Sequence, residues 1–284
     1  MITVSNEFLT AQFSEIGGEL KSLKDTSGRE YIWNGDPAFW TGSAPVLFPI
    51  CSGLKNKEYT YEGKTYTLPQ HGFARRTEFA VENVGDNSIT FLLSSDNYKN
   101  ENYPFEYELR ITYTLIGKKV EVEYKVQNRT DGDMYFSIGS HEAYYCPELI
   151  TDYEVEFDKT ETLSNCLFEE GLISDKVDVI AKDCDTFPLN YSYFENGGCL
   201  VFRDIKSRSV VLKNKSGDRK IKVDFDGFDY LLFWTVPNAP YFCIEPWCGI
   251  TDTIDTTQNI VEKEGIIHLE KDGDFYRKHS FEIL

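Results

Sequence analysis

An alternation of apolar and charged residues with a period of two runs through most of this 284-residue chain. The segment Lys119–Gln127 shows it most clearly, because valine or tyrosine occupies every second position and charged or polar residues occupy the positions between. Successive side chains of a β-strand point to opposite faces of its sheet, so this pattern predicts a strand with one buried face. Together with Tyr107–Leu115 and a turn at Ile116–Lys118, it predicts an antiparallel hairpin.

Similar short stretches recur along the chain, separated by Gly- and Asn-containing turns. The further predicted strands are Ile2–Ser5, Leu9–Ser14, Phe79–Val84, Ile89–Ser94, Met134–Ile138, Tyr153–Phe157, Cys199–Phe202, Val210–Lys213, Ile221–Phe225, Tyr230–Val236, Tyr241–Ile244 and Phe275–Ile283. No segment keeps a helical stripe for more than about two turns. We therefore predict an all-β fold, a large antiparallel β-sandwich that forms a single domain over residues 1–284. Long loops are expected at Asp36–Lys57 and Asp158–Pro188, where they could cover one face.

Composition limits the partners of such a sandwich. The formal net charge of −18 repels phosphate backbones, so nucleic acid is not an expected partner. No apolar run approaches the length of a membrane span, so a membrane is not expected either. Seven cysteines without a regular spacing, and an N-terminal segment unlike a signal peptide, predict a soluble protein with reduced thiols in the cytoplasm.

Glu245 is the one carboxylate inside the apolar run Tyr241–Gly249. A carboxylate at the end of a buried strand loses hydration, so we expect its pKa to rise. Pro246 follows it and holds the backbone rigid. These are the properties of a general base. The alternative is a structural glutamate that pairs with an arginine or caps a turn.

Two of the four histidines lie in unusual surroundings. His71 lies in a predicted tight loop between a proline and a glycine, and His141 lies at the end of an apolar strand. Histidine titrates near neutral pH, so both are candidates for a catalytic acid, with a hydrogen-bonded packing role as the alternative. His268 and His279 fall in alternating terminal strands with charged neighbours, and we expect them at the surface or at a sheet edge.

Other chemistries fit less well. The chain has no Gly-rich phosphate loop after a strand and no Gly-x-Ser-x-Gly turn. Two histidines and a carboxylate can bind zinc or iron, which leaves metal ligation by His71, His141 and Glu245 open as an alternative. Their spacing matches neither His-x-Glu nor His-x-x-x-His, so we expect no metal.

Four segments resemble signature segments of the aldose 1-epimerase (mutarotase) family. They are Pro45–Ile50, His71–Arg75, Gly139–Tyr144 and Cys243–Trp247, and they occur in the family's order. The resemblance covers nearly the whole chain and is closest to a divergent branch near the hexose-6-phosphate mutarotases. It implies a supersandwich of antiparallel strands, no cofactor, and a cleft that binds a small-molecule sugar.

The resemblance also implies roles for individual residues. Glu245 matches the general base that takes the proton of the anomeric hydroxyl, and His141 matches the general acid that protonates the ring oxygen. His71 matches a second histidine that contacts the sugar near its ring oxygen. Arg75 matches an arginine of the hexose-6-phosphate branch, and Arg76 is a second candidate that the sequence does not separate from it.

The chain departs from the galactose mutarotases at positions that bind the sugar. It has Ile50–Gly53 where they carry Asn-Arg, and Leu189–Tyr191 where they carry Leu-Asp-His. Asn190 or Asp229 is therefore the candidate substitute for their sugar-binding aspartate. Selectivity for galactose is not expected.

Three functions fit these observations. The first is an aldose 1-epimerase acting on neutral aldohexoses, with Trp247, Trp234 or Tyr144 as candidates to stack on the sugar. The second is a hexose-6-phosphate 1-epimerase, favoured by Arg75 and Arg76 and disfavoured by the net charge of −18. The third is a non-catalytic sugar-binding protein on the same fold, because a fold does not determine a function. We predict the first.

Overall fold

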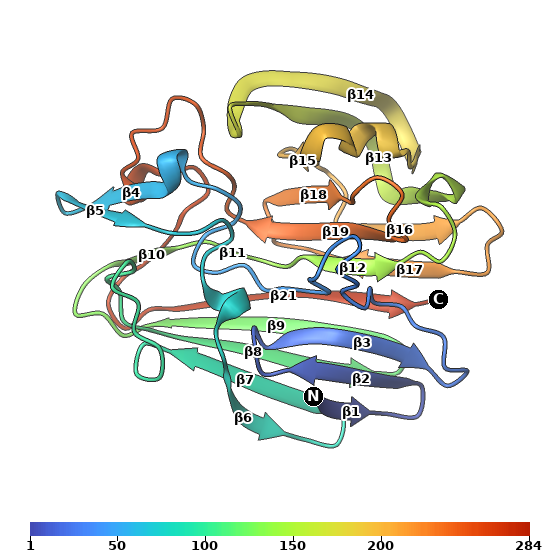
Figure 1. Ribbon diagram of the computed structural model, residues 1–284, viewed down its shortest axis with the longest axis horizontal. Coiled ribbons are helices and arrows are strands. Elements are labelled where there is room, and N and C mark those ends of the chain that lie inside the picture. The colour runs from blue at the N-terminus through green and yellow to red at the C-terminus, as the bar shows by residue number, and fades with distance from the viewer.

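The computed structural model describes residues 1–284 and contains strands, loops and five short 3₁₀ turns, with no α-helix. Its largest element is a nine-stranded antiparallel sheet, whose strands follow one another from the top to the bottom of Figure 1. In this order they are β14 (Leu172–Pro188), β13 (Tyr153–Glu169), β16 (Ser209–Asn214), β17 (Lys220–Asp224), β21 (Asp274–Ile283), β9 (Lys119–Asn128), β8 (Tyr107–Ile116), β7 (Ser88–Ser94) and β6 (Ala80–Val84). The all-β prediction is confirmed.

Two smaller antiparallel sheets form the second layer (Figure 1). The first contains β11 (Ile138–Gly139), β12 (Glu142–Tyr145), β19 (Tyr241–Cys248), β18 (Tyr230–Trp234) and β15 (Leu200–Phe202). The second contains β1 (Ile2–Ser5), β2 (Leu9–Ser14) and β3 (Glu19–Asp25). Aromatic contacts join the layers, such as Tyr144 of β12 against Phe281 of β21 and Phe13 of β2 against Tyr113 of β8.

Short elements complete the chain. Two ribbons are formed by β4 (Glu58–Tyr61) with β5 (Lys64–Thr67), and by β10 (Met134–Phe136) with β20 (Ile267–Leu269). The 3₁₀ turns are η1 (Lys55–Lys57), η2 (Ala74–Arg76), η3 (Ile150–Asp152), η4 (Tyr191–Gly197) and η5 (Ile260–Glu262). No helix has the length and hydropathy needed to cross a bilayer.

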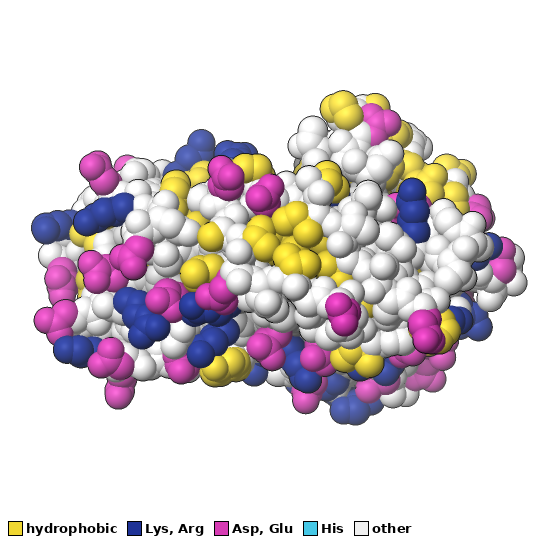
Figure 2. Space-filling view, turned by 90° about the horizontal axis from the view of Figure 1, so that it is seen from below, with side chains coloured by type: hydrophobic (Ala, Val, Ile, Leu, Met, Phe, Trp, Pro, Cys, Tyr) yellow, Lys and Arg dark blue, Asp and Glu magenta, His cyan; other side chains and the backbone are white.

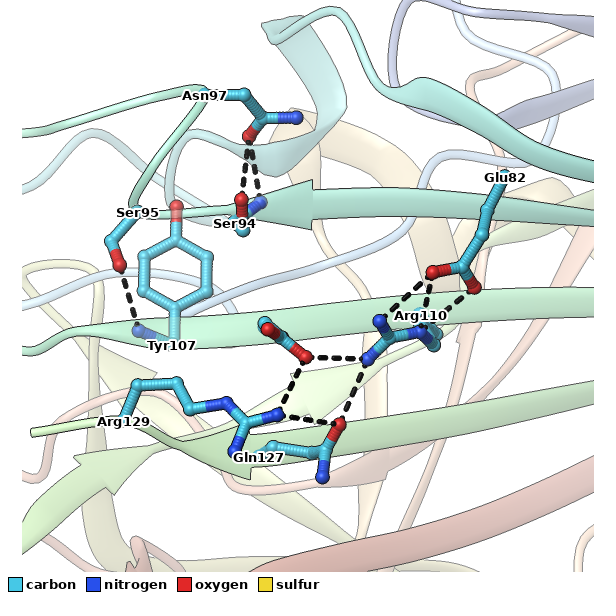
Figure 3. Close-up of polar contacts among 9 residues, drawn as sticks. Glu82, Ser94, Ser95, Asn97, Tyr107, Arg110, Gln127 and Arg129 are labelled. Atoms are coloured by element: carbon cyan, nitrogen blue, oxygen red, sulfur yellow. Dashed lines mark hydrogen bonds and ion pairs between the residues drawn. The ribbon is translucent and has the colours of Figure 1, made fainter. Parts of the chain in front are cut away.

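The period-two alternation separates the two faces of the large sheet. On β8, Leu109, Ile111 and Tyr113 are buried and belong to a continuous core of 63 residues between the layers. The intervening residues point outward, where Arg110 donates hydrogen bonds to the Glu82 carboxylate at 2.8 to 3.0 Å (Figure 3). A strand with apolar residues on one face and polar residues on the other is therefore buried on its apolar face and exposed on its polar face.

The excess of acidic residues is not gathered into a single patch on the face drawn in Figure 2. Acidic and basic side chains are interspersed there. On the outer face of the large sheet, Arg110 also contacts Glu108 at 2.7 Å, and Arg129 contacts the same carboxylate at 3.0 Å (Figure 3). Such partly exposed pairs contribute little stability each.

Two expectations from the sequence are wrong. The segment Asp158–Pro188 is not a loop, because most of it lies in the long hairpin of β13 and β14 at the top of Figure 1. His279 is not at the surface, because its side chain points to the same inner face of β21 as Phe281 and Ile283 and is buried in the core. His268 is partly exposed beside Asp133, as predicted.

The tip of this hairpin is fixed to a loop of the C-terminal part of the chain. Ile173 donates its N–H to the Asp252 carbonyl, and the N–H of Ile254 returns to the Ile173 carbonyl, each at 3.0 Å. Beneath them the Lys263 Nζ lies 2.7 Å from the Asp252 carboxylate, with both side chains 3% exposed. Lys263 also donates to the Ile250 carbonyl at 2.6 Å. A buried ion pair therefore holds the loop that carries the hairpin tip.

We predict that Lys263→Met destabilises the protein by about 3–5 kcal/mol, because it leaves the Asp252 carboxylate buried without its partner. Lys278→Met is the matched control, since that lysine pairs with Glu121 at 3.0 Å but is 62% exposed, and its loss should cost about 1 kcal/mol or less. Urea unfolding of the two variants measures both. Equal losses would contradict the role given to the buried pair.

Candidate active site

The pairing of β12 with β19 brings two of the predicted residues together. β11 and β12 pair with β19 in one continuous register, and between their paired segments this register places His141 opposite Glu245. Directly opposite residues of an antiparallel pair point to the same face of the sheet. Accordingly, Nε2 of His141 lies 3.4 Å from Oε2 of Glu245, with side chains 8% and 2% exposed. The ladder thus creates a buried imidazole–carboxylate pair.

Pro246 interrupts this ladder beside the pair. The N–H of Ser140 donates to the Pro246 carbonyl at 3.1 Å, but proline has no N–H to return. The Ser140 carbonyl instead accepts the indole N–H of Trp247 at 3.0 Å. This replacement explains how a proline is accommodated in a strand with neighbours on both sides. It also fixes the orientation of Trp247.

Alternation along β19 decides which side chains reach solvent-accessible space. Phe242 and Ile244 point into the main core, whereas Glu245 and Trp247 line a cavity of about 640 Å³. Trp234 of the neighbouring strand β18 lines it as well. The cavity therefore lies on the face of the five-stranded sheet that is turned away from the nine-stranded sheet.

Segments far apart in sequence build the remaining walls. The hairpin tip contributes Phe168 and Gly171, and the end of η4 contributes the segment from Glu195 to Cys199. Trp40 comes from the predicted loop Asp36–Lys57, which contains no strand. Its ring stacks on His141 with centroids 4.8 Å apart and an interplanar angle of 24°. No sequence motif marked these wall residues, because loop and hairpin-tip residues reach the cavity only through the tertiary fold.

The structure brings five of the six predicted site residues to this cavity. They are His71, Arg75, His141, Glu245 and Trp247. Arg76 is exposed and does not line the cavity, so the turn η2 separates the two arginines that the sequence could not. Asn190 and Asp229, the candidates to replace the sugar-binding aspartate of the galactose mutarotases, do not line the cavity. Asn190 accepts the Ser192 N–H at the start of η4, and Asp229 is exposed.

His71 enters the cavity from a strained turn. Its φ angle is 64°, and the following Gly72 has a φ of 68° in a place where a Cβ would overlap the Phe48 carbonyl. The ring accepts the Ser52 N–H at Nδ1 over 3.0 Å, so the neutral imidazole carries its proton on Nε2. Burial lowers the pKa of His71 well below its ordinary value, and His141 and Arg75 lower it further. His71 is therefore a neutral hydrogen-bond donor.

Burial also drives Glu245 and His141 toward their neutral forms. Burial raises the pKa of Glu245 well above its ordinary value, and the charge of Glu142 adds to this effect. Burial lowers the pKa of His141 to about 3, and Arg75 lowers it too, whereas a backbone hydrogen bond acts the other way. Both shifts favour a proton on Glu245 over a proton on His141.

One group of potential metal donors adjoins the cavity. The donor atoms of His141, Cys243 and Glu245 lie within 4.8 Å of one another, a different trio from the one considered with His71. A cysteine binds metal as its thiolate, and burial, with Glu245 and Glu142, raises the pKa of Cys243 well above its ordinary value. Without a bound cation the Cys243 side chain is therefore a neutral thiol.

Comparison with known proteins finds relatives over almost the whole chain. A family model described as aldose 1-epimerase matches residues 1–280. Protein LacX of Lactococcus lactis subsp. lactis is 37% identical over 276 residues, which are 92% of this chain and 91% of LacX. A galactose mutarotase related enzyme from Lactobacillus acidophilus superposes with a TM-score of 0.92 at 31% identity, over 100% of this chain and 97% of that one. A galactose mutarotase-like protein from Lactobacillus casei superposes with a TM-score of 0.93 at 28% identity, over 100% of both chains.

The raised pKa of Glu245 predicts a pH-dependent gain of stability in Glu245→Gln. Above about pH 5 the unfolded chain has released the Glu245 proton that the folded protein keeps, so wild-type stability falls relative to the amide variant by about 1.4 kcal/mol per pH unit, up to the folded pKa. Urea unfolding at pH 5.5 and 7.5 measures the difference. Glu101→Gln, at an exposed position, should show a constant difference, and a constant difference for Glu245→Gln would contradict the assignment.

Proposed function

The chain belongs to the aldose 1-epimerase family, and we propose that it interconverts the α and β anomers of an aldohexose. The observation that carries this proposal is the pair of His141 and Glu245, 3.4 Å apart and buried at the base of a cavity. Anomer exchange requires breaking the bond between the anomeric carbon and the ring oxygen. One group must take the proton of the anomeric hydroxyl while another gives a proton to the ring oxygen, and these two groups can do both.

In the proposed reaction, Glu245 takes the anomeric hydroxyl proton and His141 protonates the ring oxygen. This requires the pair as carboxylate and imidazolium, which forms when a proton moves from Glu245 to His141, whose Oε2 and Nε2 atoms lie 3.4 Å apart. The sugar then opens to a free aldehyde, rotates about the bond next to the aldehyde carbon, and closes from the other face. Closure returns both protons, so the pair is ready for the next sugar without a covalent intermediate.

The rest of the cavity supports binding of a sugar. His71 presents Nε2–H as a donor for a sugar oxygen, because Ser52 occupies its other nitrogen. Arg75 is half-buried and provides further donors in a fixed fork. Trp40, Trp234 and Trp247 offer aromatic surface for the apolar face of a sugar ring. Together these groups match a ligand with several hydroxyls and one apolar face.

A hexose 6-phosphate is the second candidate, favoured by the position of Arg75. Arg75 is the one arginine or lysine that lines the cavity, and Glu195 lines it too. A single guanidinium can hold one phosphate through paired hydrogen bonds. The Glu195 carboxylate in the cavity wall and the net charge of −18 oppose an anionic ligand. We therefore propose neutral aldohexoses as the main substrates.

We predict that Glu245→Gln keeps sugar binding and loses about 10²–10⁴-fold in kcat, because the amide fills the same space and cannot accept the proton. His141→Asn should behave similarly, and His71→Asn should raise KM as well as lower kcat. Polarimetry of freshly dissolved α-glucose and α-galactose measures the rates. His268→Asn, outside the cavity, is the control with wild-type rates. Near wild-type turnover by Glu245→Gln would remove this mechanism, and sugar binding without any mutarotation in the wild type would favour a binding protein.

We also predict that free aldohexoses are turned over more efficiently than their 6-phosphates, with loose selectivity between glucose and galactose. Arg75→Ala should weaken turnover, whereas Arg76→Ala, a matched change one residue away and outside the cavity, should have little effect. Added salt should improve the relative rate on the phosphates by screening the net negative charge. A strong preference for the 6-phosphates that Arg75→Ala abolishes and Arg76→Ala preserves would replace the proposed substrate.

A further inference from the structure

A second buried imidazole–carboxylate pair lies behind the first. Nε2 of His279 is 2.9 Å from Oε1 of Glu142, and the two side chains are 0% and 4% exposed. The Glu142 carboxylate has no other hydrogen-bond partner, and its Oε2 has none at all. Burying such a pair without a full set of hydrogen bonds is costly, so its presence calls for a role beyond stability.

The pair joins the two layers at the strand that carries the active site. Glu142 follows His141 directly, so alternation turns His141 to the cavity and Glu142 to the core. His279 comes from β21 in the nine-stranded sheet, opposite Val122 of β9. The ring of Tyr124 stacks on His279 at 5.7 Å, and Phe228 meets its other side edge-on at 5.8 Å. The contact therefore ties β12 to a rigid part of the large sheet.

The carboxylate of Glu142 lies on the core side of β12, the strand next to His141. Strand β19 brings Glu245 and Cys243 near it, and the pKa of each is raised by burial and, further, by Glu142. Tyr113, Tyr124 and Tyr144, from strands β8, β9 and β12, are also affected, because burial and the carboxylate of Glu142 both raise the pKa values of these phenols. These phenols stay neutral, and His279 is the basic side chain that contacts Glu142.

We propose that Glu142 and His279 are positioning residues for His141 and Glu245: their buried contact fixes the strand end that carries His141 and places the Glu142 carboxylate on the core side of the same strand pair. This inference rests on the proposed function for its kinetic consequence only. The free enzyme is active while His141 and Glu245 hold one proton between them. Loss of that proton from Glu245 therefore sets the alkaline limb of the pH profile of kcat/KM.

The test compares Glu142→Gln with Glu161→Gln. Glu161 is an equally buried carboxylate that accepts the Ser207 N–H at 2.6 Å and does not line the cavity. Removing the negative charge of Glu142 should make Glu245 easier to ionise, so its titration midpoint and the alkaline limb should both move to lower pH by about one unit. Glu161→Gln should leave both where they are in the wild type. The midpoint is read by ¹³C NMR of glutamate labelled at the δ-carboxyl carbon, with the Glu245 signal assigned through Glu245→Gln.

A second variant covers the case in which Glu142→Gln does not fold. His279→Gln keeps a side-chain N–H for the Glu142 carboxylate but removes the basic group that contacts it, so the Glu245 midpoint should move to higher pH. A midpoint that stays at the wild-type pH in every folded variant of the pair overturns the inference. The NMR titration needs no turnover, so a shifted midpoint in a chain that mutarotates no sugar would count against the proposed function alone.

Discussion

The register between β12 and β19 is the constraint on which the rest of the site depends. It places His141 opposite Glu245 on the cavity face and, one step along, sends Glu142 into the core toward His279. A slip of one residue would exchange these faces, because side chains alternate with a period of two. Pro246 has no N–H to donate to the Ser140 carbonyl, and the indole N–H of Trp247 donates to that carbonyl instead. The register is therefore kept across the proline. One pairing thus assembles the catalytic candidates and ties them to the large sheet.

The physical cost of this arrangement is the burial of ionisable groups. Burial acts against the charged forms of Glu245, His141 and His71 alike, and it is the largest cause of each of their pKa shifts. Such a site reduces stability, and the continuous core of 63 residues provides the compensating hydrophobic contribution. The cavity wall has its own support, because the buried Lys263 holds the loop on which the hairpin tip rests. Stability is therefore concentrated around the site rather than within it.

Much of this organisation could be predicted from alternation and short motifs. The strands around Lys119–Gln127 and the apolar run of β19 have strong patterns, because one or both of their faces are buried. The hairpin of Asp158–Pro188 lacked such a pattern, since most of β14 is exposed and its pairing follows from its position at a sheet edge. For His279 the pattern was present: it shares the phase of Phe281 and Ile283, although its charged neighbours suggested a surface strand. The separation of Arg75 from Arg76 depends on the turn η2, which no periodicity encodes.

The charge balance of the cavity connects the structure to the proposed reaction. Moving a net charge into or out of a dry site costs far more than moving a proton within it. In anomer exchange each proton that leaves a sugar oxygen is matched by one that arrives at another, and the pair of His141 and Glu245 keeps the same total number of protons before and after ring opening. A buried pair with one shared proton is therefore suited to a reaction on a neutral sugar. An anionic group on the ligand would have to stay near the mouth, where Arg75 is still partly exposed to solvent.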